Sequence, residues 1–398
     1  MRFLHTSDWH VGKALKGRGR LDEQRAVLDE IVRAARDHRV DAVLVAGDLY
    51  ESAAPSAQAQ RLVVQTLLAL RDTGAEVIAI AGNHDHAAVF DAYRPLMASA
   101  GITLAGGVRT AAEGGVVEFT ARSTGEPVVV AMLPFLPHHR AVRAAQLIGG
   151  TPQQATADYG RLVGDLLAAL AEGFRADAVN LVTAHLMTAG GRLGGGERPA
   201  QSIVDYWVPV DVFPPTANYV ALGHLHRRQA VPAPCPVHYC GSPMALDFGE
   251  EDDPAMVLLV EAEPGAPADV VAEVPLTAGR RLRTVHGTVE ELARRADSFG
   301  DDHLRVVLNE PARAGLRQEV QRLLPNALEV RIAPEFAAPA NPGRRRAPAG
   351  DAHRSPAELF HEYCLARGVA DPHVEALFAG LLDRVTAEEA RAAEKDSS

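Results

Sequence analysis

The sequence predicts an α/β fold with a mostly parallel sheet, because short apolar runs alternate with segments of helical spacing. Residues 21–39 and 59–72 repeat apolar side chains at intervals of three and four, which is typical of an amphipathic helix. The apolar runs are rich in Val, Ile, Leu and Ala and too short to be independent helices, so they are predicted to be buried strands. These strands are residues 2–6, 42–46, 77–81, 179–184 and 219–222.

Residue types that bind metals follow each of these runs directly. The groups are Asp8-Trp9-His10, Gly47-Asp48, Gly82-Asn83-His84-Asp85, His185 and Gly223-His224-Leu225-His226. Because ligands gather at the carboxyl ends of strands in such sheets, we expect the groups to converge on one pocket. One such group alone is more often a turn or a helix cap, but unrelated turns would not produce five in order behind five strands.

The residue types in these groups fit a pair of metal ions. We assign Asp8, His10 and His226 to one ion, Asn83, His185 and His224 to the other, and Asp48 to the bridge. Imidazole and oxygen ligands without thiolate suit Mn, Fe or Zn better than an all-oxygen Ca or Mg cage, and two Mn²⁺ are our first choice. Two such ions with two aspartates and a hydroxide leave about one positive charge facing the pocket, which favours a phosphodiester anion.

The chemistry expected of this pocket is hydrolysis by a metal-activated hydroxide. Paired metals lower the pKa of a bridging water and clamp the attacking and leaving oxygens of an in-line displacement. His84 is predicted to be the catalytic side chain, which protonates the leaving oxygen or stabilises charge on the phosphoryl group. Asp85 is the candidate that orients His84.

The order of these residues resembles that of the calcineurin-like metallophosphoesterases. Longer strings resemble the SbcD family of nuclease subunits within it: residues 6–13 (TSDWHVGK), 184–187 (AHLM), 221–226 (ALGHLH) and 239–249 (YCGSPMALDFG). The similarity covers residues 1 to about 250 and continues more loosely to about 385. It implies a four-layer metallophosphoesterase sandwich, which we place at residues 1–277.

The resemblance also implies a function. Its members are manganese-dependent DNA nucleases with 3′ to 5′ double-strand exonuclease activity and endonuclease activity on hairpins and single strands. They act in DNA break and hairpin processing with an SbcC-type ATPase that has long coiled coils. We therefore expect double-stranded DNA ends and hairpins as substrates, and a homodimer within a heterotetramer.

Residues 278–336 are predicted to form a small α+β unit, with strands at 281–287, 304–308 and 329–332 and helices at 289–296 and 315–324. The resemblance implies a cap that leans on duplex DNA near the pocket. A purely structural role stays open. The candidate DNA contacts of this unit are Arg280, Arg281, Arg283, Arg294, Arg295, Arg313 and Arg317.

The last part of the chain is predicted to be a tether followed by a partner-binding segment. Residues 337–354 are dense in Pro, Ala, Gly and Arg, which is typical of a flexible linker. Residues 355–386 begin with a capping box and carry an apolar stripe at helical spacing, so a helix-loop-helix is predicted, before a polar tail at 387–398. Given the resemblance, we favour docking of this stripe on the coiled-coil base of the ATPase, with packing on its own body as the alternative.

Composition bounds the remaining possibilities. No run of about 18 apolar residues occurs and Met1 leads directly into a strand, so we expect a cytoplasmic, nucleoid-associated protein without a membrane segment. The cysteines Cys235, Cys240 and Cys364 lack zinc or redox spacing and are expected to be inert thiols.

The net charge of −11 argues at first against a DNA-binding protein, because Lys and Arg supply most non-specific affinity. Local basic groups matter more than the sum. The candidates in the first 200 residues are Lys13, Lys16, Arg18, Arg20, Arg192 and Arg198, and the acidic run Glu250 to Asp253 is expected to lie away from the site.

Two rival functions stay open. A small-molecule phosphodiesterase or phosphatase of the same fold would use the same ligands but would not need the cap, the tether or the tail. A non-catalytic metal-binding scaffold would be expected to have lost ligands, whereas His84 and all seven ligand positions are present.

Overall fold

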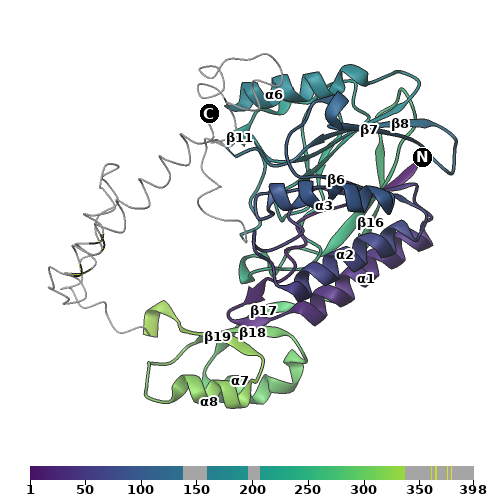
Figure 1. Ribbon diagram of the computed structural model, residues 1–398. Helices are drawn as coiled ribbons and strands as arrows, with labels where there is room; N and C mark the ends of the chain where they lie inside the picture. The colour runs from purple at the N-terminus through teal and green to yellow at the C-terminus, as the bar shows by residue number, and fades with distance from the viewer. Residues whose placement is uncertain are drawn as a thin grey trace. The chain divides into compact units, whose positions relative to one another are not determined.

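The computed structural model describes residues 1–137, 159–195 and 207–336, together with the single positions 360, 364, 374 and 378. The chain divides into two compact units, Met1–Ala333 and Pro334–Ser398. Among the described residues, the first unit contains two sheets of six strands, one of three strands and two of two strands. Figure 1 shows the large sheets and the small three-stranded sheet.

The first large sheet has six strands in the order β16-β15-β1-β4-β5-β6. Its strands are β1 (Arg2–Thr6), β4 (Ala42–Val45), β5 (Glu76–Ile80), β6 (Ile102–Ala105), β15 (Met256–Glu261) and β16 (Asp269–Pro275). Strands β1, β4, β5 and β6 are parallel, and β15 and β16 extend the sheet in antiparallel pairing. The connecting helices are α1 (Leu21–Asp37), α2 (Ala57–Arg71) and α3 (Ala87–Ser99).

The second large sheet has the order β13-β14-β12-β9-β8-β7, with a parallel centre and antiparallel edges. Its strands are β7 (Val116–Thr120), β8 (Pro127–Leu133), β9 (Val179–His185), β12 (Tyr219–Gly223), β13 (Gln229–Val231) and β14 (Val237–Tyr239), and α6 (Tyr159–Leu170) covers it. Shorter elements are β2 (Ala14–Leu15), β3 (Arg18–Gly19), β10 (Met187–Thr188), β11 (Trp207–Val208), η1 (Ala111–Glu113), η3 (Ala171–Gly173), η6 (Val210–Val212) and η7 (Phe248–Glu250).

The central strands of both sheets are buried on both faces. Along β1, Leu4 packs under the helices of the first sheet while Phe3 packs against the second sheet, and β4 repeats this alternation with Val43 and Leu44. These two faces belong to two apolar clusters, and a third apolar cluster fills the space between the second sheet and α6. Helices, sheet, sheet and helix therefore form four layers, which confirms the predicted fold class (Figure 1).

The five predicted strands do not share one sheet. Strands β1, β4 and β5 lie in the first sheet, whereas β9 and β12 lie in the second. The apolar runs could not reveal this division. Each sheet is covered by a helix layer on one face and by the other sheet on the opposite face, so its buried strands have the same composition in either sheet. The pocket is consequently built where the carboxyl ends of two sheets meet.

The small unit is a three-stranded parallel sheet with two helices. Its elements are β17 (Leu282–Gly287), α7 (Val289–Arg295), η8 (Ala296–Phe299), β18 (His303–Leu308), α8 (Leu316–Leu323) and β19 (Ala327–Ile332), followed by η9 (Pro334–Phe336). Val285, Leu292, Val306 and Val320 belong to its separate apolar core. The predicted helices and strands of this unit are confirmed, and each predicted end lies within two residues of the observed end.

A polar contact joins the small sheet to helix α1. The carboxylate of Glu23 lies 2.8 Å from His303 Nε2 on β18 and accepts two hydrogen bonds from Arg20. Arg20 also donates to the carbonyl of Ala245 and is only 3% exposed. The prediction that Arg20 contacts DNA is therefore wrong, since its guanidinium is buried and hydrogen-bonded to Glu23 and Ala245.

Most of the predicted tail lies outside the described residues, as do residues 337–354 and 387–398. Phe360, Cys364, Val374 and Phe378 are described, and all four are helical. The rings of Phe360 and Phe378 stack with centroids 3.9 Å apart. In the part of the chain that the structure describes, no helix is long and apolar enough to cross a membrane.

The contact of Glu23 with His303 and Arg20 predicts that the free energy of unfolding depends on pH. Burial raises the pKa of Glu23, but hydrogen bonds from His303 and Arg20 outweigh it and lower this pKa to about 2. The stabilisation is therefore complete above the ordinary value of 4.5 and is lost as the pH falls from there towards 2. We expect Glu23→Gln to cost about 2 kcal/mol at pH 7, as for charged hydrogen bonds, and less at pH 3.5. Thermal unfolding at both pH values, with the exposed Glu290→Gln as control, checks this; an equal loss at both values would contradict it.

Candidate metal centre and active site

The seven predicted ligands come together at the carboxyl ends of strands from both sheets. Asp8, His10, Asp48 and Asn83 follow β1, β4 and β5 of the first sheet. His185 ends β9, and His224 and His226 follow β12 of the second sheet. Six of the seven side chains are buried and Asn83 is half-buried, so the site lies inside the seam between the sheets.

One group of donors gathers around His10 and His226. Their Nε2 atoms lie 3.1 Å apart, and donor atoms of Asp8, His10 and His226 all lie within 4.8 Å of one another. The outer nitrogens of both rings face carboxylates: His10 Nδ1 is 3.0 Å from Glu51 Oε2, and His226 Nδ1 is 2.7 Å from Glu250 Oε1. These carboxylates fix the rings so that both Nε2 atoms face the same point.

A second group gathers around the amide of Asn83. Its Oδ1 lies 2.8 Å from His185 Nε2 and 2.7 Å from His224 Nδ1. His185 Nδ1 lies 2.8 Å from the carbonyl oxygen of Ala46, which can only accept a hydrogen bond, so Nδ1 carries a proton and Nε2 is the ring atom that faces Asn83. These are the three residues predicted for the second ion.

Asp48 lies between the two groups. Its Oδ2 is 3.5 Å from His10 Nε2 and equally 3.5 Å from His185 Nε2, one in each group. Its Oδ1 accepts a hydrogen bond of 2.8 Å from the backbone N–H of His84. The carboxylate is thus held in the position expected of a bridging ligand.

The spacing of these donors fits metal coordination. Two ligand atoms that each lie about 2.1 Å from one ion are about 3.0 to 3.4 Å apart at ordinary coordination angles. The separations of 2.7 to 3.5 Å within the two groups and between them and Asp48 lie within about 0.3 Å of that range. Acceptors on the outer nitrogens of metal-binding histidines are also the usual supporting contacts. The residues present therefore fit a pair of divalent metal ions.

Burial and neighbouring charges set the protonation states of the side chains in the pocket. Burial lowers the pKa of His10 to about 3 and that of His224 to about 3, so both rings are neutral, as a metal ligand requires. Burial opposes ionisation of Asp48, but the charge and hydrogen bond of His185 outweigh burial and hold the pKa of this carboxyl well below its usual value. Asp48 is therefore an ionised acceptor. Asp48 in turn raises the pKa of His185 to about 9 against the effect of burial, so this ring must lose a proton to bind an ion.

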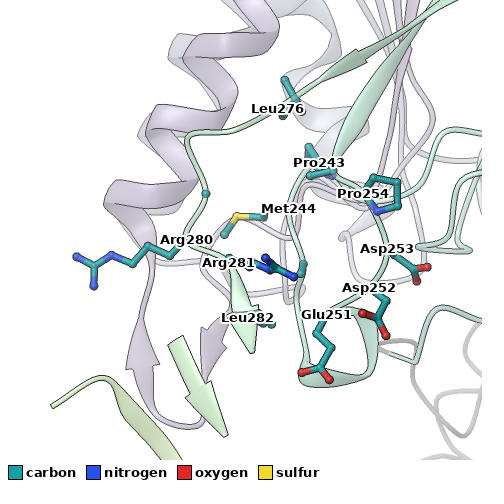
Figure 2. A pocket seen from close by; sticks show the side chains of 13 residues that line it. Pro243, Met244, Glu251, Asp252, Asp253, Pro254, Leu276, Arg280, Arg281 and Leu282 are labelled. Carbon is teal, nitrogen blue, oxygen red and sulfur yellow. The ribbon is translucent and has the colours of Figure 1, made fainter. Parts of the chain in front are cut away.

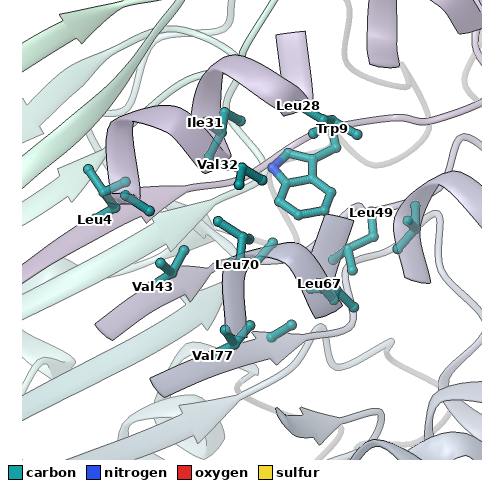
Figure 3. Packing of buried hydrophobic residues seen from close by; sticks show 14 of the residues in the cluster. Leu4, Trp9, Leu28, Ile31, Val32, Val43, Leu49, Leu67, Leu70 and Val77 are labelled. Carbon is teal, nitrogen blue, oxygen red and sulfur yellow. The ribbon is translucent and has the colours of Figure 1, made fainter. Parts of the chain in front are cut away.

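Backbone strain is concentrated at the site. Asp8, His10, Asp48 and His224 have φ values of 54°, 45°, 52° and 99°, in the left-handed region that few residues other than glycine adopt. Between the first two, the side chain of Trp9 points the opposite way and packs among Leu28, Leu67 and other residues of the core under α1 and α2 (Figure 3). This buried indole anchors the strained loop.

The loops that carry the ligands are also joined to one another by their own polar groups. The Asp8 carboxylate accepts a hydrogen bond of 3.0 Å from the backbone N–H of His224, which connects the loops after β1 and β12. Ser7 Oγ donates to Asp8 Oδ2 and lies 3.0 Å from Cys240 Sγ. Cys235, Cys240 and Cys364 are buried free thiols, and burial raises the pKa of Cys235 to about 11.

His84 and Asp85 have different surroundings. His84 Nδ1 lies 2.7 Å from the carbonyl oxygen of Glu51, so Nδ1 holds the proton and Nε2 is the atom that can exchange one. Asp85 instead accepts hydrogen bonds from the backbone N–H groups of Leu49, Tyr50 and Gly82. The contacts do not favour the expectation that Asp85 orients His84. The carbonyl oxygen of Glu51 contacts the His84 ring, whereas Asp85 connects the loops that follow β4 and β5.

Three residues near the ligands were missed from the sequence. Glu51 contacts His10 and His84, and Phe135 stacks on His224 with ring centroids 6.1 Å apart. Glu250 was expected to lie away from the site, yet it is 1% exposed and contacts His226. That expectation was wrong because an acidic run suggests a solvated surface, and the sequence does not show that Glu250 turns inward at η7.

The other basic residues predicted to contact DNA are ion-paired or exposed where the structure describes them. Lys13 pairs with Glu51, and Lys16 lies near Asp247 and Glu329. Arg18 and Arg192 are exposed, and Arg198 lies outside the described residues.

A glycine substitution tests the close packing of the site. Gly47 has φ +94°, and a Cβ there would lie 2.2 Å from His185 Nδ1. Gly17 has a similar φ of +85°, but a Cβ there would meet nothing within 4 Å. We expect Gly47→Ala and Gly17→Ala to share a backbone cost of about 1 kcal/mol. Only Gly47→Ala should weaken Mn²⁺ binding, by more than about 10-fold, because His185 must move. Calorimetric Mn²⁺ titration of both variants decides; unchanged binding by Gly47→Ala would contradict the described geometry.

Comparison with known proteins agrees with the site. A family profile described as calcineurin-like phosphoesterase matches residues 1–228. The SbcD subunit of the nuclease SbcCD from Bacillus subtilis is 36% identical over 286 residues, which are 71% of this chain and 71% of that protein. The SbcD subunits from Escherichia coli K12 and Rhodobacter capsulatus are 32% and 34% identical, over 63% and 67% of this chain and 62% and 67% of their own lengths. This chain belongs to the calcineurin-like phosphoesterase family, and its similarity to SbcD nuclease subunits extends beyond the matched family region.

Proposed function

We propose that this chain is the nuclease subunit of an SbcCD-type complex and hydrolyses DNA phosphodiesters with two divalent ions. The observation that carries the proposal is the placement of Asp48 Oδ2 at 3.5 Å from a histidine of each donor group. A single carboxylate oxygen shared between two sets of ligands is what a dimetal site requires. Relatives named as SbcD subunits of the nuclease SbcCD support a nucleic acid as the substrate.

In the proposed site, Asp8, His10 and His226 hold one ion and Asn83, His185 and His224 hold the other, with Asp48 as the bridge. When bound, the ions supply a hydroxide nucleophile and stabilise charge on the phosphoryl oxygens. His84 then acts through Nε2, which gives a proton to the leaving oxygen, because its Nδ1 proton is already donated to the carbonyl of Glu51. Asp85 supports this arrangement by holding the backbone of the adjacent loops.

Divalent metals fit the donor set, and we propose Mn²⁺ as the native pair. Histidine nitrogens combined with carboxylate and amide oxygens suit Mn, with Fe or Zn as substitutes.

We propose that residues 1–277 form the nuclease domain and residues 278–336 a capping domain that contacts duplex DNA. Of the predicted contacts, Arg281, Arg294 and Arg317 are exposed, whereas Arg283 packs over the ring of Phe299 at 5.3 Å. The proposed substrates are double-stranded ends, cut 3′ to 5′, and hairpins or single strands, cut internally.

We propose a homodimer that binds an SbcC-type ATPase through residues 355–386, forming a cytoplasmic, nucleoid-associated complex on chromosomal DNA. Phe360 and Phe378, both helical, stack on one another, which supports the predicted helix-loop-helix. Helix α3 exposes Val89, Tyr93 and Leu96, spaced by four and three residues, an apolar stripe that a second copy would cover.

The rival functions are less well supported. A small-molecule phosphatase has no use for the arginines of the small unit or for an apolar tail. A non-catalytic scaffold does not explain why all seven donors and His84 are retained, with all but Asn83 buried.

Cleavage of a labelled hairpin duplex in Mn²⁺ tests the chemistry. We expect His84→Ala to lower kcat about 10²- to 10⁴-fold, as for loss of a general acid, while both ions still bind. Asp48→Ala should lose both cleavage and one ion, because it removes the bridge. The exposed neighbour His86→Ala is the control and should cleave normally. Cleavage that persists in Asp48→Ala would refute the metal assignment.

The assembly is tested by reciprocal variants. Deleting residues 355–398 should abolish co-purification with the ATPase while the dimer and turnover of a small diester survive. Leu96→Asp should do the converse, since a charge at the most exposed residue of the α3 stripe would prevent dimerisation, with exposed Leu193→Asp as its control. Co-purification that survives the deletion would refute the tail assignment, and a dimeric Leu96→Asp protein would refute the interface.

A further inference from the structure

The short helical turn η7 has one side chain directed at the candidate metal centre. Glu250 is 1% exposed, and its two carboxylate oxygens have separate partners. Oε1 lies 2.7 Å from His226 Nδ1, while Oε2 accepts a hydrogen bond of 2.7 Å from the backbone N–H of Leu246. The carboxylate therefore fixes the orientation of the His226 ring relative to the chain segment that carries it.

The neighbouring side chains of the same segment are held by the small sheet. The guanidinium of Arg305 on β18 lies over the ring of Phe248, 4.6 Å from its centroid, and also approaches Asp247. Phe248 packs with Leu15 and with Leu282 of β17. Glu251 accepts a hydrogen bond of 2.6 Å from Thr284 of β17. Residues 247–251 thus contact a predicted metal ligand through one residue and the small sheet through the adjacent ones.

A cavity lies beside this segment, at the connection to the small unit. It has a volume of about 310 Å³ and is lined by Glu251 and Asp252 on one wall and by Arg280 and Arg281 of the connecting segment on another (Figure 2). The connecting segment is therefore not packed tightly against the body on this side. The contacts through residues 247–251 are among those that determine how the small sheet sits on the body.

We propose that Glu250 is a positioning residue for His226, and that residues 247–251 couple the placement of the small sheet to the metal centre. A turn of three residues is too short to absorb a displacement internally, so a shift of Phe248 moves Glu250 with it. A shifted carboxylate turns the His226 ring and makes its Nε2 a poorer electron donor. The position of the small sheet thereby sets the affinity of the ion that His226 is proposed to hold.

The inference rests on the proposed function, because it concerns one of the proposed metal ligands. Binding of Mn²⁺ and Co²⁺ to the full chain, by calorimetry and by the visible absorption of Co²⁺, provides readouts that do not depend on cleavage. We expect two ions in the wild-type chain. Glu250→Ala should weaken one of them about 10- to 100-fold, the usual effect of removing a partner of a metal-bound histidine. Glu250→Gln, which keeps the size of the side chain but cannot accept at both positions, should give a smaller loss and a shifted Co²⁺ spectrum.

Coupling is tested from the opposite side of the segment by Arg305→Ala, with Arg331→Ala as a matched control. Arg331 lies on the adjacent strand β19 and pairs with Glu329, a partner it shares with Arg305, but is not among the contacts of residues 247–251. Arg305→Ala should weaken the same ion as Glu250→Ala, whereas Arg331→Ala should bind as wild type does. In the double variant, Arg305→Ala should cause no further loss beyond Glu250→Ala, because both act on His226 through one path.

The binding measurements test the positioning role, the coupling and the proposed function separately. Wild-type affinity in both Glu250 variants would refute the positioning role, and wild-type affinity in Arg305→Ala or strictly additive losses in the double variant would refute the coupling. Failure of the wild-type chain to bind any divalent ion would instead refute the proposed function. Thermal unfolding and circular dichroism of each variant show that weakened binding occurs in a folded chain.

Discussion

The carboxylate of Asp48 is the point on which the polar structure depends. One oxygen accepts from the backbone of His84, and the other lies equally far from His10 and His185. Its position therefore relates loops from both sheets. A buried carboxylate is costly unless its charge is compensated, and here the imidazole of His185 and the backbone N–H of His84 provide that compensation before any ligand is considered.

Much of this arrangement could be predicted from the sequence. Strands buried on both faces appear as unbroken apolar runs, and the polar residues that follow Thr6, Val45 and Ile80 can then only lie at the strand ends. Polar residues lie at the strand ends whichever sheet a strand joins. The pocket could therefore be predicted even though β9 and β12 belong to a second sheet.

The supporting contacts could not be predicted in the same way. Glu250 and Arg20 were assigned to solvent or to DNA because charged residues outside a recognisable motif are usually solvated. Both are buried by tertiary contacts between segments more than 20 residues apart in the chain: Glu250 with His226, and Arg20 with Ala245. Asp85 illustrates the same limit, since its partners are backbone N–H groups, which every residue except proline provides. Sequence identifies side chains that share a chemistry, and it does not identify those whose partner is the main chain.

The left-handed backbone at Asp8, His10, Asp48 and His224 restricts which residues can occupy these positions, independently of metal chemistry. Glycine and asparagine tolerate such torsions best, so the chain keeps residues with backbone strain at positions where less strained residues would fit. A descendant that no longer needed ions would gain stability by replacing them, and the replacements would be towards glycine or asparagine. Drift of that kind at these four positions would mark a pseudoenzyme in this lineage before any assay is done.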